Sequence, residues 1–256
     1  MTSERAGNDV KGMTAAETPS PGRPSPWPRR LGTAAAILAA LLVGFFVGEQ
    51  EFAPRRARLP IIHSAPTYTL VNQLGQKISS RSFGGKVQIV TFLFPYCTTL
   101  CPLIAAHLVN FENLEARPAG IAKKVEIVSL NLDPAGTGPP QMRAFLKQYG
   151  WNPEDPAWQY LTGSPAAIRR IVRNGFGIGY EKVPISSEKP GETQMVQPEI
   201  VNPLAQKAHV DYDIVHNDAI EIVDKEGRIR KIFQSADTVG PDRLMKVVRA
   251  LLGERN

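Results

Sequence analysis

An apolar segment near the N-terminus constrains this chain more than any other feature. Residues 31–48 run for eighteen positions without a charged side chain, and Arg29 and Arg30 directly precede them. A helix of that length just spans the hydrocarbon core of a bilayer. The sequence therefore predicts a single transmembrane anchor at 31–48. The leader before it, residues 1–30, is rich in Pro and Ser near its end and is expected to be disordered in the cytoplasm.

This segment has two other interpretations. A cleaved signal peptide usually has a shorter apolar region and a small-x-small cleavage site, and no such site occurs here before Glu49. The pair Arg29-Arg30 also resembles a twin-arginine export signal, although the surrounding residues fit loosely. We favour the uncleaved anchor.

The flanking charges predict the orientation of the anchor. Five basic residues precede the apolar segment and three follow it closely: Arg5, Lys11, Arg23, Arg29 and Arg30, then Arg55, Arg56 and Arg58. This asymmetry favours the N-terminus inside the cytoplasm. The protein is thus expected to be single-pass in the inner membrane, with its C-terminal domain on the periplasmic side.

The rest of the chain has room for one domain. With 256 residues and 43% hydrophobic content, a packed domain of roughly 150–190 residues is expected. A linker is predicted at 49–65, where prolines and charges show no period, and the domain at 66–256. Five of the basic residues lie in the leader, the rest of the chain is only mildly basic, and no run of Lys and Arg interleaves with aromatic residues. A nucleic-acid partner is therefore not expected.

Hydrophobic periodicity predicts strands and helices that alternate along this domain, which implies a parallel βαβ core. A segment with no period, at 185–208, is expected to be an exposed loop or long hairpin. The expected elements are hairpins at 68–71/77–79 and 219–223/228–233, buried strands at 87–94 and 125–132, and helices at 98–114, 140–149, 164–174 and 241–252.

The only two cysteines, Cys97 and Cys101, fall where the strand at 87–94 meets the following helix. A spacing of four residues places both sulfurs on one helix face, close enough to share a metal ion or, after modest rearrangement, to form a disulfide. A helix N-terminus also favours the thiolate form. The pair is interpreted as reactive. A structural disulfide or two inert, buried thiols are the alternatives.

Copper commonly takes an imidazole ligand beside thiolates. Of the four histidines, His63 lies in the predicted linker and is expected to be solvated, while His107 lies too far along its helix to reach a metal at the helix start. His209 and His216 both precede the closing hairpin, and His216 is the better candidate. By default, a lone histidine such as this has a structural or surface role.

Five motifs in order along the chain then resemble the Sco/SenC family, thioredoxin-fold proteins associated with copper delivery to cytochrome c oxidase. The match extends from about Pro66 to Leu252. The motifs are Cys97-x-x-x-Cys101-Pro102, Ser129–Pro134 ending in Asp-Pro, Leu161–Ser164, Asp211-Tyr212 through His216, and Asp224–Gly227.

This resemblance implies an α/β, thioredoxin-like fold with a central mixed sheet flanked by helices. It also implies a copper site formed by Cys97, Cys101 and His216, and a copper-acceptor partner, a cytochrome c oxidase subunit. The chain departs from the family at Thr98-Thr99-Leu100, where Pro-Asp-Val is common, and at Thr137 and Val215, where acidic residues are common. These departures alter the local charge, and the three ligands are retained.

Two functions follow from these residues. In the first, the chain is a copper metallochaperone. In the second, it is a thiol–disulfide oxidoreductase in which Cys97 attacks a partner and Cys101 resolves the mixed disulfide. Dedicated oxidoreductases more often have two residues between their cysteines, which favours the first function. A copper sensor or a binding module without catalysis is a third possibility.

Overall fold

The computed structural model describes residues 38–40, 58–184, 202–208 and 210–254. The predicted leader and most of the predicted anchor lie outside these ranges, and residues 38–40 of the anchor are helical. Within the described ranges, no helix combines the length and the apolar character needed to cross a bilayer. The described residues from 58 onward form the domain that carries the cysteines.

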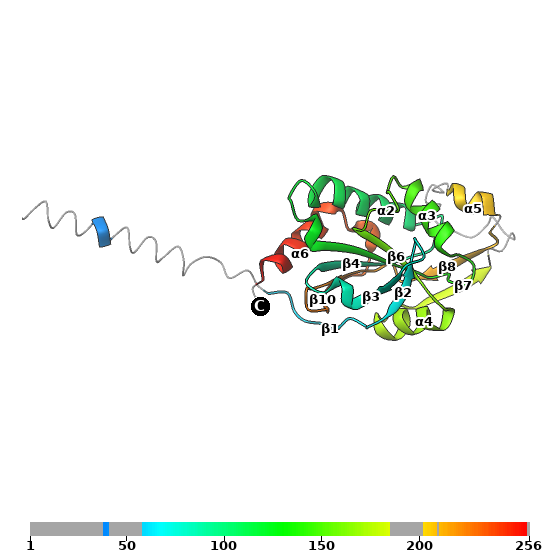
Figure 1. The fold of residues 1–256 in the computed structure, drawn as a ribbon, viewed down its shortest axis with the longest axis horizontal. Helices are drawn as coiled ribbons and strands as arrows, with labels where there is room; N and C mark the ends of the chain where they lie inside the picture. The colour runs from blue at the N-terminus through cyan, green and yellow to red at the C-terminus, as the bar shows by residue number, and fades with distance from the viewer. Residues whose placement is uncertain (1–37, 41–57, 185–201, 209, 255–256) are drawn as a thin grey trace, which may run out of the picture. The chain divides into compact units, whose positions relative to one another are not determined.

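A mixed sheet of eight strands forms the centre of this domain (Figure 1), in the order β1-β10-β9-β4-β5-β6-β2-β3. The three central strands, β4, β5 and β6, are parallel to one another, and the strands on either side pair antiparallel. Two further strands, β7 and β8, form a separate antiparallel sheet. The bounds are β1 His63–Ser64, β2 Thr69–Asn72, β3 Lys77–Ser79, β4 Val87–Leu93, β5 Val125–Asn131, β6 Trp158–Thr162, β7 Tyr180–Pro184, β8 Tyr212–His216, β9 Ile220–Val223 and β10 Arg228–Phe233.

Helices cover both faces of the main sheet (Figure 1), with α2, α3 and α6 on one face and α4 on the other. Their bounds are α2 Cys101–Asn110, α3 Pro139–Gln148, α4 Pro165–Arg169, α5 Pro203–Ala208 and α6 Pro241–Gly253. Two helices continue as π-helical turns, α2 into η2 (Phe111–Ala116) and α4 into η4 (Arg170–Gly175).

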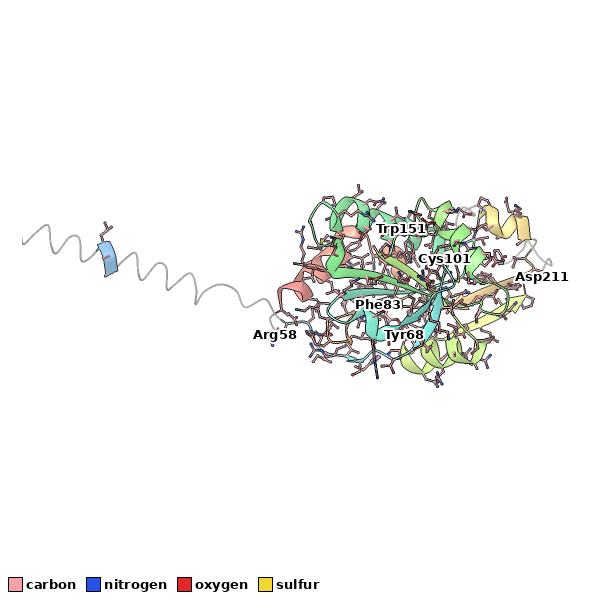
Figure 2. All side chains as sticks on the ribbon, in the orientation of Figure 1. Arg58, Tyr68, Phe83, Cys101, Trp151 and Asp211 are labelled. Atoms are coloured by element: carbon pink, nitrogen blue, oxygen red, sulfur yellow. The ribbon has the colours of Figure 1, made fainter. Side chains whose placement is uncertain are left out.

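Side chains fill the space between the sheet and the helices on each of its faces, with Trp151 on the side of α2 and Tyr68 on the side of α4 (Figure 2). On the first side, the ring of Phe145 from α3 packs 5.7 Å from that of Tyr160 on β6. On the second, Phe92 of β4 meets the ring of Phe176 at 5.5 Å. Because alternate residues of the central strands enter two different cores, these strands read as continuous apolar runs.

Much of the predicted secondary structure is confirmed. The strand at 87–94 corresponds to β4 and the strand at 125–132 to β5, and every residue of both strands is buried. Both predicted hairpins form, as β2–β3 and β9–β10. Gly75 and Gly227 take φ values of +80° and +79° in their turns, a region that favours glycine. Strand β6, however, was not expected from the sequence.

The predicted helix at 98–114 differs from the structure at both ends. It begins at Cys101, because residues 98–100 form bends, and it becomes π-helical from Phe111. The wider π-turn rotates the following residues away from the 3.6-residue stripe. Leu114, which a regular α-helix would place on the same inner face as Ile104 and Leu108, is therefore 66% exposed.

The prediction of an exposed loop or hairpin at 185–208 is wrong for its last part. Residues 203–208 form α5, and Asn202 just before this helix is completely buried. Residues 185–201 lie outside the described ranges. A buried polar residue is favourable only when its hydrogen bonds are made, and the partners of Asn202 come from distant parts of the chain.

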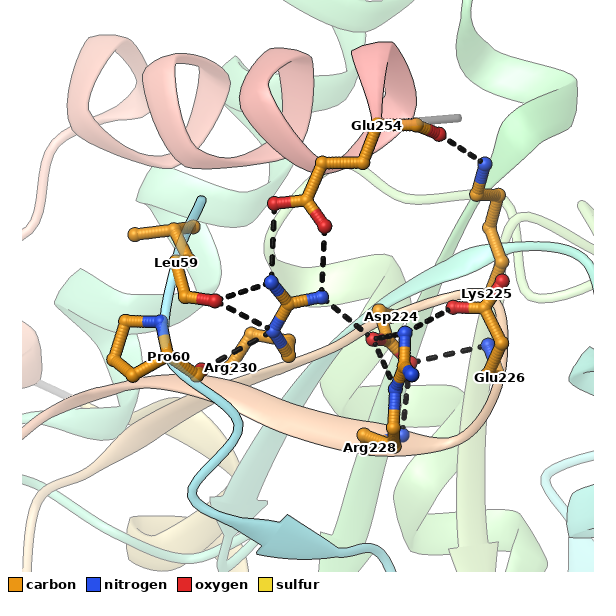
Figure 3. Close-up of polar contacts among 8 residues, drawn as sticks. All are labelled: Leu59, Pro60, Asp224, Lys225, Glu226, Arg228, Arg230 and Glu254. Carbon is orange, nitrogen blue, oxygen red and sulfur yellow. Dashed lines mark hydrogen bonds and ion pairs between the residues drawn. The ribbon is translucent and has the colours of Figure 1, made fainter. Parts of the chain in front are cut away.

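The end of the predicted linker, 49–65, also belongs to the fold. Strand β1 pairs with β10, and Arg230 of β10 donates hydrogen bonds to the carbonyl oxygens of Leu59 and Pro60 (Figure 3). The same guanidinium pairs with Asp224 at 2.8 Å and with Glu254 at 2.9 Å. One buried arginine thus joins the start of the domain to the closing hairpin and to the end of α6.

Candidate functional site

Cys97 lies in the loop between β4 and α2, and Cys101 is the first residue of α2. The expectation that both sulfurs lie on one helix face is therefore wrong. The chain turns after β4 through a hydrogen bond from the Cys97 N–H to the Phe94 carbonyl oxygen, 3.0 Å long. The turn still brings the two thiols into hydrogen-bond contact. Both are free, and they are buried, with Cys97 4% and Cys101 0% exposed; Cys101 lies inside the domain (Figure 2).

The two thiols differ in acidity. A hydrogen bond from the Cys101 thiol, which outweighs the effect of burial, lowers the pKa of Cys97 to about 6; the Thr99 hydroxyl, 3.4 Å from the Cys97 sulfur, adds to this. The same hydrogen bond, together with burial, raises the pKa of Cys101 well above its ordinary value. At neutral pH the pair therefore holds one thiolate, at Cys97, and one thiol.

His216 ends strand β8, opposite Tyr180 of β7. Its Nδ1 atom lies 3.1 Å from the Asn217 carbonyl oxygen and 3.7 Å from the Asp218 carboxylate. In the ranges that the structure describes, no three His, Cys, Asp or Glu side chains lie close enough together to hold one metal ion. The structure thus brings Cys97 and Cys101 together and leaves His216 apart from them.

Asp218 lies near both the histidine and the buried cysteine Cys101, and the sequence did not point to it. Its carboxylate contacts His216, and its charge is one of the smaller causes that raise the pKa of Cys101. Burial raises the pKa of Asp218 itself, and the nearby His216 opposes that rise. The imidazole and the buried thiol therefore lie near a shared carboxylate.

A hydrogen bond from the Tyr212 hydroxyl to the Asp133 carboxylate, 2.6 Å long, anchors the strand that carries His216. The Tyr212 ring also packs 5.7 Å from that of Phe94, at the start of the cysteine loop, and the Lys182 ammonium lies 3.2 Å from its centre. Gly136 leaves room for the pair, since a Cβ there would lie 2.3 Å from the carboxylate and 2.5 Å from the hydroxyl. These contacts join the β7–β8 sheet to the ends of β4 and β5.

An open pocket of about 570 Å³ borders His216 and gives solvent access to the β7–β8 sheet. Arg173, Tyr180 and Asn217 also line it. The other histidines differ from one another in setting. His63 is exposed on β1, as expected, and His209 lies outside the described ranges. His107 is half-buried on α2, and its Nδ1 has no hydrogen-bond partner in the described parts of the chain.

The fold and the site together define a thioredoxin-like α/β domain with a cysteine pair between a central strand and the helix that follows it. The family model for SCO1/SenC matches residues 61–253 of this chain. The protein belongs to the SCO1/SenC family.

Individual relatives agree with this assignment. The SCO1 protein homolog of Bacillus subtilis is 23% identical over 193 residues, which cover 75% of this chain and 84% of the homolog. Bradyrhizobium japonicum ScoI, solved with copper bound, has a TM-score of 0.53 and 19% identity, over 73% of this chain and 99% of that structure. BsSco, described as a member of the Sco family of cytochrome c oxidase assembly proteins, has a TM-score of 0.56 and 21% identity over 77% and 99%. At these identities the two structures support the fold.

Proposed function

We propose that this protein is a membrane-anchored copper metallochaperone that carries copper on Cys97, Cys101 and His216. The observation that carries the proposal is the pair of adjacent free thiols, one of which has a pKa of about 6. A metal ligand must be deprotonated, and soft sulfur donors suit Cu(I) and also bind Cu(II). Copper here is the cargo, and the pair provides its first two ligands.

His216 is proposed as the third ligand, supplied by a movement of the β7–β8 sheet. This small sheet pairs only within itself among the described strands, so that His216 could approach the sulfurs without breaking a strand pair of the main sheet. Tyr212 holds the strand near the cysteine loop. A ligand that joins and leaves in this way suits a protein that must release its metal by ligand exchange.

The proposed acceptor is a subunit of cytochrome c oxidase. Support comes from family membership, from ScoI solved with copper bound, and from BsSco, described as belonging to a family of oxidase assembly proteins. The apolar segment 31–48 is proposed to anchor the chain in the inner membrane with the domain in the periplasm. A tether to the same membrane would raise the effective concentration of the donor near such an acceptor.

Copper titration of the reduced full-length chain in detergent tests the ligand set. We expect one copper per chain, loss of tight binding in Cys97→Ala and Cys101→Ala, and at least tenfold weaker binding with an altered spectrum in His216→Ala. His63→Ala, at the exposed strand β1, is the matched control and should bind as the wild type does. Unchanged affinity and spectrum in His216→Ala would remove His216 from the site.

Delivery is tested in cells. A strain that lacks this protein should lose cytochrome c oxidase activity, and added copper should restore it. A sensor would instead change the response to copper without being required for oxidase assembly. Oxidase activity that stays normal in the deletion strain under copper limitation would contradict delivery.

Thiol–disulfide exchange is the second candidate, and the unequal acidity of the two cysteines favours it. A thiolate at Cys97 suits the attacking group, and a protonated Cys101 suits the resolving group. The burial of Cys97 requires the client to open the loop first. In a Cys101→Ser variant, a mixed disulfide with an oxidase subunit should accumulate, and its absence would count strongly against this function.

A further inference from the structure

The side chain of Asn202 is completely buried, although it lies in the stretch that the sequence predicted to be exposed. A buried carboxamide is costly unless its donors and its acceptor all find partners. Its Nδ2 donates to the carbonyl oxygens of Pro95 at 3.0 Å and Cys97 at 2.7 Å. Its Oδ1 accepts from the Gln148 side chain at 3.2 Å and from the Leu204 N–H at 3.0 Å. Asn202 is therefore fully bonded.

The acceptor half of this side chain caps α5. Oδ1 accepts from the N–H groups of Leu204 and Ala205, the second and third residues of the helix, and Pro203 occupies its first position. Asparagine before a proline at the first helical position is a common helix start. Capping needs only an acceptor, so aspartate or serine would serve as well.

The donor half of the side chain has no part in capping. Both of its hydrogen bonds go to the loop between β4 and α2, more than 100 residues away in sequence. They hold the carbonyls on either side of Tyr96, one of which belongs to Cys97 itself. The Cys97 N–H is already held by Phe94. The main chain of Cys97 is therefore fixed at both its N–H and its C=O.

We propose that Asn202 is a positioning residue for the cysteine pair. Its two donated hydrogen bonds fix the Pro95–Cys97 main chain so that the Cys97 sulfur lies beside Cys101. They also couple α5 to the site. The part of this inference that concerns copper rests on the proposed function. The part that concerns the dithiol does not, because the geometry exists without metal.

The two hydrogen bonds that Asn202 donates to the loop should favour the dithiol over the disulfide. When the disulfide forms at neutral pH, the Cys97 thiolate and the Cys101 thiol together lose two electrons and the Cys101 proton. Glutathione disulfide takes up the two electrons and, with that proton and one from solvent, becomes two glutathione molecules. Asn202 bonds the loop main chain in the state with two free thiols, so any main-chain movement that brings the sulfurs to bonding distance works against its hydrogen bonds. Removing the donors of Asn202 should therefore make the disulfide relatively more stable.

The test compares Asn202→Asp with the wild type as reduced, full-length protein in detergent. Aspartate keeps the acceptor that caps α5 and lacks the two N–H donors. Asn202→Ser is a neutral second variant in case the new charge unfolds the region. Ser164→Ala is the matched control, because Ser164 caps α4 through an N–H of Ala167 on the opposite face of the sheet. Thermal unfolding confirms that each variant is folded.

The quantity measured is the equilibrium constant of the pair with glutathione. We expect it to shift at least tenfold toward the disulfide in both Asn202 variants, about 30 mV for this two-electron couple, and to stay at the wild-type value in Ser164→Ala. The copper spectrum should change in the same two variants. A wild-type constant in a folded Asn202 variant would overturn the inference, even if copper binds. A shifted constant in a protein that binds no copper would instead overturn the proposed function and leave the positioning role standing.

Discussion

The hydroxyl of Tyr212 donates a hydrogen bond of 2.6 Å to the carboxylate of Asp133, 79 residues earlier in the chain. Asp133 follows β5, and Tyr212 begins the strand that ends in His216. The other oxygen of the carboxylate accepts from the Gly136 N–H at 3.2 Å. This contact therefore links the loop after the central strand β5 to the β7–β8 sheet, which carries the candidate third ligand, His216.

Tyr212→Phe should make the β7–β8 sheet less stable. The change leaves one oxygen of the buried Asp133 carboxylate without its donor, and a hydrogen bond to a charged group contributes about 1.5–3 kcal/mol. We expect the free energy of unfolding to fall by that amount and amide exchange to rise across β7 and β8. If the β7–β8 sheet positions His216, the affinity for copper should fall as well, while the number of copper ions bound per chain stays unchanged.

Tyr180→Phe is the control for this change, because Tyr180 lies on the partner strand and its hydroxyl makes no hydrogen bond within the described residues. It should leave exchange and affinity close to those of the wild type. Equal rates of amide exchange across β8 in the wild type and in Tyr212→Phe would show that the contact with Asp133 does not stabilise the β7–β8 sheet.

Cys101→Ala should make Cys97 less acidic. The hydrogen bond from Cys101 is the main cause of the low pKa of Cys97, so its loss should raise that pKa from about 6 toward the ordinary value of about 8.5. Alkylation of Cys97 at pH 7 should then slow by about tenfold, and the midpoint of its pH profile should rise. Thr99→Ala removes a weaker contact and should move the midpoint less. A midpoint that stays near 6 in Cys101→Ala would contradict the shared hydrogen bond.

The elements that the sequence predicted correctly are those with a strong local pattern. Strand β4 is an unbroken apolar run, and the β9–β10 hairpin has a glycine at the position that needs positive φ. The neighbouring cysteines were visible for the same reason. In each case the deciding residues lie within a few positions of one another.

The features that were missed depend on contacts between distant residues. Strand β6 is short, and its place is set by parallel pairing with β5 and by a hydrogen bond from the Trp158 indole to Ser129 at 2.8 Å. Asn202 occurs among Pro, Gln and Glu residues, which resemble a surface loop, and its partners are more than 100 residues away. The hydrophobic periodicity of a segment gives no information about a contact between residues so far apart in the sequence. The separation of His216 from the sulfurs is likewise a matter of tertiary structure.

Glu221 should make stability depend on pH. This carboxyl is completely buried on β9, between Val90 and Ile232 of the neighbouring strands, and neither oxygen has a hydrogen-bond partner in the described chain. Burial raises its pKa to about 8, against about 4.3 in the unfolded chain. The folded state therefore keeps a proton that the unfolded state loses between these values, and the free energy of unfolding should fall as pH rises from about 4.3 to 8.

Glu221→Gln removes this dependence. The variant should match the wild type near pH 4 and become the more stable protein as pH rises, by up to about 3 kcal/mol at pH 7. Urea unfolding at a series of pH values measures the difference. Glu154→Gln, at an exposed carboxylate, should leave the pH dependence unchanged. Parallel curves for the wild type and Glu221→Gln would show that Glu221 ionises at its ordinary pKa in the folded protein.

Arg230→Met should release the start of the domain. Arg230 is 3% exposed and holds Asp224, Glu254 and the carbonyl oxygens of Leu59 and Pro60 (Figure 3). Its loss removes one of the two arginine partners of the buried Asp224 carboxylate, which keeps Arg228, and the ion-pair partner of Glu254. Removing one partner of a buried ion pair typically costs 3–5 kcal/mol, and since Glu254 is partly exposed we expect about 3 kcal/mol. Protease cleavage between residues 58 and 65 should also accelerate. Arg228→Met changes a neighbouring arginine whose side chain is 35% exposed and should cost markedly less. Equal losses in the two variants would mean that burial of Arg230 gives it no special role in joining residues 58–65 to the hairpin.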